Sequence, residues 1–193
     1  FPSATPLEGT QSTIILDIRN KRFDWWLNLD DDVVPHRNPL ELIECDKDII
    51  GLPAPIWIKK PDGLEYMHWG AYRWDEERQS YRHFEAKDTL EEVDGVAGAC
   101  FLIRGSVFDN EELQHGAFHR RWNPDGTVKM GNDMSFCWRA KKAGFKIHAH
   151  FGYRCSHYKE MDLAHIQSIY QKLIEDGPTK ETEPEECCAA AAL

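Results

Sequence analysis

Apolar residues near the start of the chain recur at helical spacing and then form a short continuous run. Ile14, Ile15 and Ile18 share one face of a helix that is predicted over 10–23. The segment 24–30 is apolar and aromatic and stops at three consecutive aspartates, as a buried strand does where it leaves a sheet. The chain is therefore predicted to open with a helix and a core strand.

Short helices and strands are predicted through the next part of the chain. A helix is expected over 38–44, because Pro39 in a first turn needs no backbone donor. The apolar residues at 48–52 predict a core strand, and a further strand is expected at 82–86. Between them, the Pro-Asp-Gly sequence at 61–63 is typical of a hairpin turn.

The second half of the chain continues this alternation. The small and then apolar run 95–104 predicts a central strand, and Asn132 is expected to cap a helix that Gly144 ends. The run 146–151 alternates, with apolar residues on one face and histidines on the other, which predicts another strand. Apolar residues at helical spacing predict a last helix at 160–175. The pattern as a whole is that of an α/β protein.

Composition narrows the class of protein. The chain has 193 residues, of which 41% are hydrophobic, enough for one ordinary globular core. The 33 acidic and 23 basic residues give a net charge of -10 with no basic stripe, so we expect no nucleic-acid partner. No apolar run approaches the roughly 20 residues that cross a bilayer, so no transmembrane segment is expected.

The cysteines indicate the redox compartment of the protein, and the composition of the C-terminal segment indicates a domain boundary. The six cysteines form no CxxC pair, which predicts free thiols in a reducing compartment. The expected location is the cytoplasm of a bacterium or of an infected host cell, with peripheral membrane association left open. One domain is predicted over 1–177, followed at 178–193 by an acidic tail whose final Ala-Ala-Ala-Ala-Leu is typical of a cloning remnant.

The sharpest chemical feature is the triplet Asp30, Asp31 and Asp32. Adjacent carboxylates raise one another's pKa unless a cation or hydrogen-bond donors neutralise them. Oxygen ligands suit Mg²⁺ or Mn²⁺, and Mg²⁺ is usually held by one or two carboxylates together with substrate phosphates. The triplet therefore predicts a site for a metal and a nucleotide diphosphate. A solvated acidic loop or a helix N-cap is the alternative.

The aspartates lie in a segment that resembles a known family. The sequence 23–35 resembles the strand and Asp-x-Asp motif of GT-A glycosyltransferases of the family 2 type, which bacteria and large viruses use to build surface glycans. The resemblance covers about residues 11–160, and its further motifs follow in the family's order. They are the mid-domain strand at 95–104, the acidic acceptor-side motif at 132–133, the following turn at 143–147 and the late histidine segment at 155–157. One departure is that only a short segment precedes the aspartates, so the N-terminal nucleotide-binding part is short or missing.

The resemblance implies a fold and a reaction. The fold would be a GT-A-like single domain with a central mixed β-sheet flanked by helices. The activity would be a hexosyltransferase that moves a hexose or deoxyhexose from a UDP-sugar to a glycan or glycoprotein acceptor, with Mn²⁺ or Mg²⁺ as cofactor. A nucleotidyltransferase, or a catalytically degenerate domain that binds a glycan or a partner, is the alternative.

The resemblance also implies roles for individual residues around the metal and the donor. Asp32 would bind the metal, Asp30 would contact the metal and the ribose or sugar side of the nucleotide, and Asp31 could take either role. His157 would be a further metal or phosphate ligand, with an ordinary structural histidine as the alternative. Arg19 would reach a phosphate, with a surface salt bridge as the alternative.

Two further residues would act on the acceptor side. Asp133 is the candidate general base that takes the proton of the acceptor hydroxyl, and a helix-capping carboxylate is the alternative. Gly98, in the small-residue run, would let the sugar and the acceptor approach the backbone. Aromatic residues in the middle of the chain fit either an acceptor groove or cross-strand packing, and these are Trp57, Tyr66, Trp69, Tyr72, Trp74 and Tyr81.

Overall fold

The computed structural model describes residues 6–59, 63, 65–84, 86 and 88–176. The chain divides into two compact units, Phe1–Tyr158 and Lys159–Leu193. The second unit holds helix α4 (Leu163–Asp176), which confirms the helix predicted at 160–175. This division falls before that helix, whereas the sequence suggested one after residue 177. The predicted tail at 178–193 lies outside the described residues, as does most of the predicted turn at 61–63.

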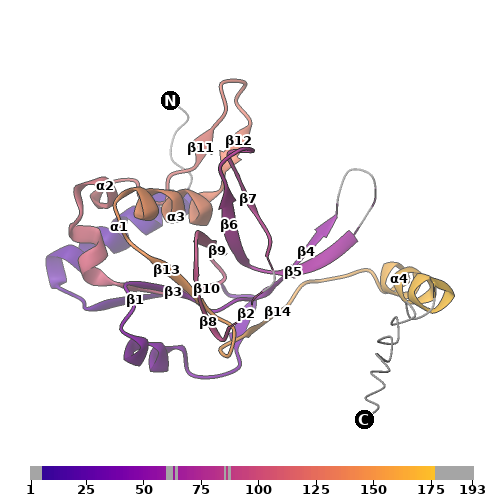
Figure 1. Ribbon diagram of the computed structural model, residues 1–193. Coiled ribbons are helices and arrows are strands. Elements are labelled where there is room, and N and C mark those ends of the chain that lie inside the picture. The colour runs from indigo at the N-terminus through magenta and orange to yellow at the C-terminus, as the bar shows by residue number, and fades with distance from the viewer. Residues whose placement is uncertain (1–5, 60–62, 64, 85, 87, 177–193) are drawn as a thin grey trace, which may run out of the picture. The chain divides into compact units, whose positions relative to one another are not determined.

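A five-stranded mixed sheet forms the centre of the first unit (Figure 1). Its strands occur in the order β1 (Trp25–Leu29), β10 (Cys100–Arg104), β3 (Ile49–Gly51), β13 (Ile147–His150) and β8 (Leu90–Val93). The β3–β13 pair is parallel, and the other three neighbouring pairs are antiparallel. The prediction of a mixed α/β fold is therefore confirmed, including the strands expected at 24–30, 48–52 and 146–151.

Helical segments cover both faces of this sheet. On one face lie α1 (Pro6–Lys21), η2 (Gly105–Asp109), α2 (Glu111–Gln114) and α3 (Asn132–Lys142), which Figure 1 shows together on the same side. The 3-10 helix η1 (Pro39–Cys45) packs through Leu42 on the other face. The helices predicted at 10–23 and 38–44 are thus present, and Asn38 caps η1 by accepting from the amide of Leu40.

The alternation of side chains along β10 divides the core into two layers. Phe101 and Ile103 pack with the buried residues of α1 and α3, whereas Cys100 and Leu102 pack on the η1 side. All four side chains are fully buried or nearly so. Because both faces of β10 are covered, its sequence is a continuous apolar run.

Small sheets surround the central one and shape its edges. They are β2 (Val33–Pro35) with β14 (Cys155–His157), β4 (Pro55–Lys59) with β5 (Glu65–Trp69), β6 (Ala71–Asp75) with β7 (Ser80–Arg82) and β9 (Gly95–Val96), and β11 (Arg121–Trp122) with β12 (Val128–Met130). The predicted hairpin is confirmed by the antiparallel pairing of β4 with β5.

Three local predictions need correction. The run 95–104 is broken into β9 and β10, because the backbone of Gly98 bonds to the side chains of Asn28 and Asp133 and turns there. The strand predicted at 82–86 ends at Arg82, where its partner β6 no longer accompanies it. The helix predicted to be capped by Asn132 has Gly131 at its N-cap, and Asn132 is its first residue.

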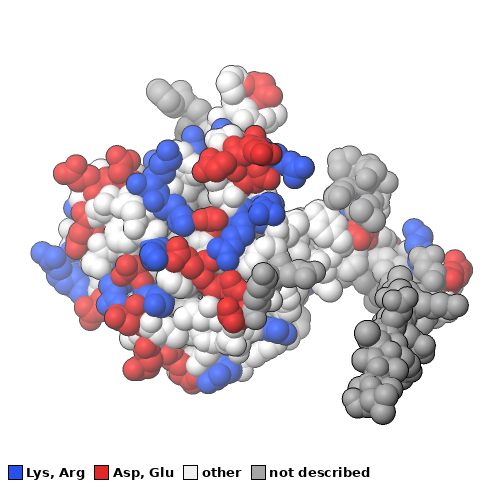
Figure 2. All heavy atoms as spheres, in the orientation of Figure 1, with Lys and Arg blue, Asp and Glu red and all other residues white. Residues whose placement is uncertain are grey.

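The described cysteines are free thiols, as predicted. Cys100, Cys137 and Cys155 are buried and Cys45 is half-buried, while Cys187 and Cys188 lie outside the described residues. Within the described ranges, no helix combines the length and the apolar character that crossing a membrane requires. Acidic and basic side chains are interspersed over the face of the described first unit that Figure 2 shows.

Candidate functional site

The aspartate triplet lies where β1 ends and the chain turns back. The amide of Asp30 donates to the carbonyl of Ala99 at 2.9 Å, which continues the pairing of β1 with β10 by one step. The amide of Val33 then donates to the carbonyl of Asp30 at 3.2 Å, so residues 30–33 form a tight turn into β2. The turn presents the carboxylates at the carboxyl end of β1, the edge where open α/β sheets bind ligands.

The pairing of β2 with β14 brings His157 to this turn. His157 lies opposite Val33 in the register, and its Nε2 is 3.4 Å from Oδ2 of Asp32. The other ring nitrogen, Nδ1, lies 2.9 Å from the carbonyl oxygen of Pro55. A carbonyl only accepts, so Nδ1 carries a proton and orients the ring with Nε2 toward Asp32. A histidine held in this way by a backbone carbonyl is typical of metal ligands.

Asp133 approaches the same edge from the start of α3. Its Oδ2 accepts from the amide of Gly98 at 2.9 Å, and its Oδ1 accepts from the amide of Met134 at 2.8 Å. A Cβ at Gly98 would lie 3.3 Å from the Cβ of Asp133, tighter than nearly all contacts of this kind. Asn28 of β1 donates from Nδ2 to the carbonyl of Gly98. Glycine at 98 therefore permits the close approach of this loop to α3.

A pocket of about 330 Å³ is lined by Asp30 and Asp133, whereas Asp32 and His157 are not among its lining residues. Its lining combines both carboxylates with polar and apolar side chains, and includes Leu7, Gln11, Asn28, Asp30, Gly98, Phe101, Phe118, Arg120, Gly131, Asn132 and Asp133. The Arg120 guanidinium donates from Nε to Oδ1 of Asn132 at 2.9 Å. Asn132 in turn donates to the carbonyl of Phe118 at 3.0 Å, so this wall is fixed by hydrogen bonds. Asn132 is thus a lining residue of the pocket.

The electrostatics of the pocket favour a cation. Partial burial raises the pKa of Asp30, and the charges of Asp32 and Asp133 raise it further. The His157 imidazole acts in the opposite direction, and Asp31, which is exposed, adds a smaller upward effect. A bound positive charge would favour the ionised form of Asp30 and offset the charges of the neighbouring carboxylates.

The residues at this edge could supply some of the ligands of a metal ion, with the substrate supplying the others. Among the described side chains, no three or more His, Cys, Asp or Glu are grouped closely enough to hold a metal ion by themselves. Asp32 and His157 form a pair that offers a carboxylate oxygen and an imidazole nitrogen. One or two protein ligands completed by phosphate oxygens is the usual arrangement for Mg²⁺ and suits Mn²⁺ as well.

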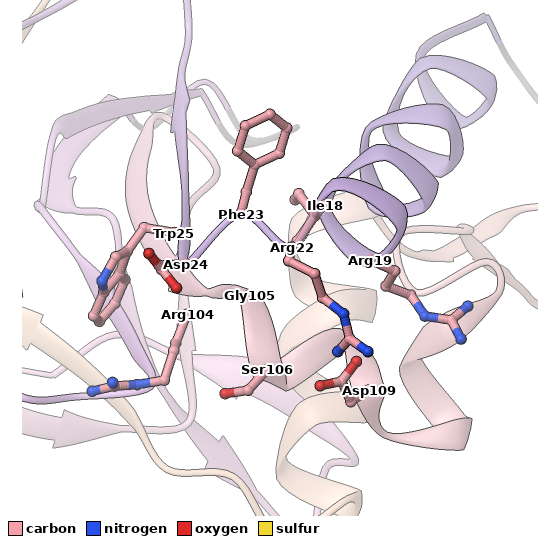
Figure 3. A pocket seen from close by; sticks show the side chains of 10 residues that line it. All are labelled: Ile18, Arg19, Arg22, Phe23, Asp24, Trp25, Arg104, Gly105, Ser106 and Asp109. Carbon is pink, nitrogen blue, oxygen red and sulfur yellow. The ribbon is translucent and has the colours of Figure 1, made fainter.

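Arg19 lies apart from the other predicted site residues. It lines a separate pocket of about 490 Å³, together with Arg22, Phe23 and Asp109, at the end of the sheet where β1 begins (Figure 3). Helix α1 ends beside the start of β1, whereas the aspartates follow the end of β1. The structure therefore does not bring Arg19 to the aspartates, and its predicted phosphate contact at that site is not supported.

Two residues of the pocket were missed by sequence reasoning. Asn28 is a polar residue inside an otherwise apolar strand, a signal that was available in the sequence. Arg120 lies in a connecting segment. Its backbone amide donates a hydrogen bond to Oε1 of Glu8 at 2.8 Å, which fixes the position of this segment. No local pattern indicates this contact, since Glu8 belongs to α1 and is distant in the sequence.

Comparison with known proteins identifies no family for this chain. No protein-family model matches the chain, and no curated protein matches it. Among solved structures, the crystal structure of A197 from STIV is similar, with 14% sequence identity and a TM-score of 0.49. The match covers 80% of this chain and 68% of that one.

Proposed function

We propose that the first unit is a metal-dependent glycosyltransferase domain of the GT-A type. The reaction is transfer of a hexose or deoxyhexose from a UDP-sugar to a hydroxyl of a glycan or glycoprotein acceptor. One observation carries the proposal: Asp30, Asp32, His157 and Asp133 converge at the carboxyl end of β1 from three separate parts of the chain. The motifs in which these residues lie resemble the glycosyltransferase motifs in the same order.

Asp32 and His157 are the residues that would hold the cation with the donor diphosphate. A cation bound there offsets the negative charge that develops on the departing UDP. Asp30 lines the pocket, and the charges of both Asp32 and Asp133 act on it. We assign it to the ribose or sugar side of the donor, with Asp31 next to it at the exposed tip of the turn.

Asp133 is assigned the role of general base. Each of its carboxylate oxygens accepts one backbone amide hydrogen, which fixes the orientation of the group. Each oxygen retains a further lone pair that can accept the proton of an acceptor hydroxyl. Because Asp133 and Asp30 line one pocket, the base and the donor-side carboxylate face the same space.

The remaining lining groups suit a sugar. The side chains of Arg120 and Asn132 can hydrogen-bond hydroxyl groups, and Phe118 offers an apolar surface. Gly98, which also lines the pocket, adds no side chain to it. This mixture of fixed polar groups and apolar surface is typical of small-ligand pockets.

The proposal is tested by calorimetric titration of UDP in the presence and absence of Mn²⁺. We expect the wild type to bind UDP only when Mn²⁺ is present and D32A to lose at least about tenfold in affinity. D109A is the matched control, because Asp109 is an exposed aspartate at the opposite end of β1. Equal Mn²⁺-dependent affinity in D32A and D109A would remove the basis for the metal site.

A further inference from the structure

The Arg120 guanidinium lines the pocket at the site with most of its hydrogen-bond donors unused. Its Nε donates to Oδ1 of Asn132 at 2.9 Å, and the side chain is half-buried. A guanidinium has five N–H donors, so the four on its terminal nitrogens remain. Among the residues that the structure describes, these terminal nitrogens have no hydrogen-bond or ion-pair partner. A positive charge is therefore available in the pocket.

Hydrogen bonds on two sides fix the segment that carries Arg120. Its backbone amide donates to Oε1 of Glu8 in α1 at 2.8 Å, and the Ser135 hydroxyl in α3 donates to the carbonyl of His119 at 2.6 Å. Asn132, at the start of α3, holds the Arg120 side chain itself. The guanidinium is thus held in place before a ligand arrives, which lowers the entropy lost on binding.

Asn132 orients the guanidinium without neutralising it. Its amide oxygen accepts one hydrogen bond and carries no net charge. An aspartate at this position would form an ion pair with Arg120 and occupy its charge. The two carboxylates that line the pocket, Asp30 and Asp133, form no ion pair with Arg120 within the described part of the chain. The charge therefore stays open to a ligand.

The geometry and the charges of the pocket favour a carboxylate as the partner of this guanidinium. Planar guanidinium groups bind the two oxygens of a carboxylate through paired hydrogen bonds. A phosphate ester carries about two negative charges, so Asp30 and Asp133 would repel it more strongly than a singly charged carboxylate. Asp133, in the same pocket, is the group to which we assign the proton of a hydroxyl. A ligand that suits both groups carries a carboxylate and a hydroxyl.

We propose that Arg120 binds the carboxylate of an acidic saccharide acceptor, of the uronic acid class, while the reacting hydroxyl of that acceptor lies at Asp133. This inference rests on the proposed function and adds the charge of the acceptor, which that function leaves open. Selectivity follows because a neutral sugar would cover the guanidinium without pairing its charge. Arg120 is thus a specificity-determining residue.

The test compares probes that share a sugar ring and differ in one group. Methyl glucuronoside carries a carboxylate where methyl glucoside carries a hydroxymethyl group, and methyl galacturonoside and methyl galactoside form a second pair. Calorimetric titrations are run with and without Mn²⁺ and UDP. We expect the wild type to bind the acidic member of at least one pair about tenfold more tightly than the neutral member, as one charge-assisted bidentate contact predicts. This preference should shrink as the salt concentration rises.

Three variants separate the charge of Arg120 from its structural role. R120A should bring the two affinities of that pair to within about twofold of each other. R120K keeps a charge but not the planar fork, and it should retain only part of the preference. N132D keeps Arg120 and should lose most of the preference, because the new carboxylate pairs with the guanidinium. R19A is the matched control, since Arg19 is also half-buried but lines the pocket at the start of β1, and it should keep the wild-type preference.

R120K and N132D decide the question if R120A does not fold. Equal wild-type affinity for the acidic and neutral members of both pairs, no binding of any probe, or a preference that survives in R120A and N132D would overturn the inference, even if Mn²⁺-dependent UDP binding is intact. Tighter binding of glucose 6-phosphate than of either uronoside would overturn the carboxylate assignment. Arg120-dependent uronoside binding without any UDP binding would instead overturn the proposed transferase and support an acidic-saccharide site at Arg120.

Discussion

His157 Nε2 lies 3.4 Å from Asp32 Oδ2, although the two residues come from distant parts of the chain. The contact depends on the antiparallel pairing of β14 with β2, which places His157 opposite Val33. It also depends on Pro55, whose carbonyl oxygen accepts a hydrogen bond from Nδ1–H of His157. The pair that we propose as metal ligands is thus held by backbone structure on both sides.

The first prediction concerns this pair. H157A is expected to weaken Mn²⁺-dependent UDP binding by at least about tenfold, because one of two protein ligands is lost. H36A is the control, since His36 is an exposed histidine next to the same β2–β14 pair and contacts Ser156. The measurement is calorimetric titration, and a smaller effect in H157A than in H36A would exclude His157 as a ligand.

The second prediction separates binding from proton transfer. D133N retains an oxygen that can accept from the amide of Gly98 but cannot act as a base. Transfer to an acceptor is therefore expected to fall by about 10²-fold or more, with UDP affinity within about twofold of wild type. Product analysis by mass spectrometry measures the first quantity and titration the second. Unchanged transfer in D133N would show that another group takes the proton.

The third prediction concerns acid stability. Burial acts to raise the pKa of Asp94, but hydrogen bonds from Lys141 at 2.9 Å and from the amide of Trp74 at 2.9 Å outweigh it and hold this pKa below its usual value. A carboxyl with a lowered folded-state pKa contributes stability that is present at neutral pH and lost as the pH falls through that pKa.

D94N is therefore expected to be less stable than wild type by about 1 kcal/mol at pH 7, with the difference shrinking below about pH 4. Urea unfolding at a series of pH values measures this. D88N serves as the control, because Asp88 is exposed and its carboxylate makes no ion pair or hydrogen bond with the residues that the structure describes. A D94N deficit that stays constant down to pH 3 would contradict the assignment.

The fourth prediction concerns the core beneath the site. Phe136 is fully buried, and its ring stacks on that of Phe118 with centroids 4.4 Å apart and planes 6° from parallel. F136A leaves a cavity and should lower the free energy of unfolding by about 3–5 kcal/mol. F23A, at a side chain that is 53% exposed, should cost less than about 1 kcal/mol in the same chemical unfolding experiment. Similar losses in both variants would contradict this account of the core.

Local patterns were sufficient to predict most elements of the central sheet. The apolar run before the aspartates is β1, and the alternation at 146–151 is β13, with Ile147 and Ala149 buried and His148 and His150 half-buried. In both strands, apolar residues occupy the positions that are buried in the core, and this pattern can be seen in the sequence. In contrast, β8 is not predicted. It is an edge strand, and its sequence, Leu-Glu-Glu-Val, contains few apolar residues.

The site was predictable only where its residues lie in local motifs. The turn after β1 and the start of α3 are such places, and there the structure brings Asp30 and Asp133 to one pocket. The separation of Arg19 from the aspartates was not predictable, since the direction of α1 depends on its packing against η2. The contact of Arg120 with Asn132 also depends on tertiary packing.

The most direct test of the proposed transferase is UDP release from a panel of UDP-sugars, with and without Mn²⁺. Water can replace the acceptor in such an assay, so the donor is identified even before the acceptor is known. The account predicts release from one sugar that requires Mn²⁺ and is lost in D32A. Absence of release from every UDP-sugar, together with no Mn²⁺-dependent UDP binding, would contradict it.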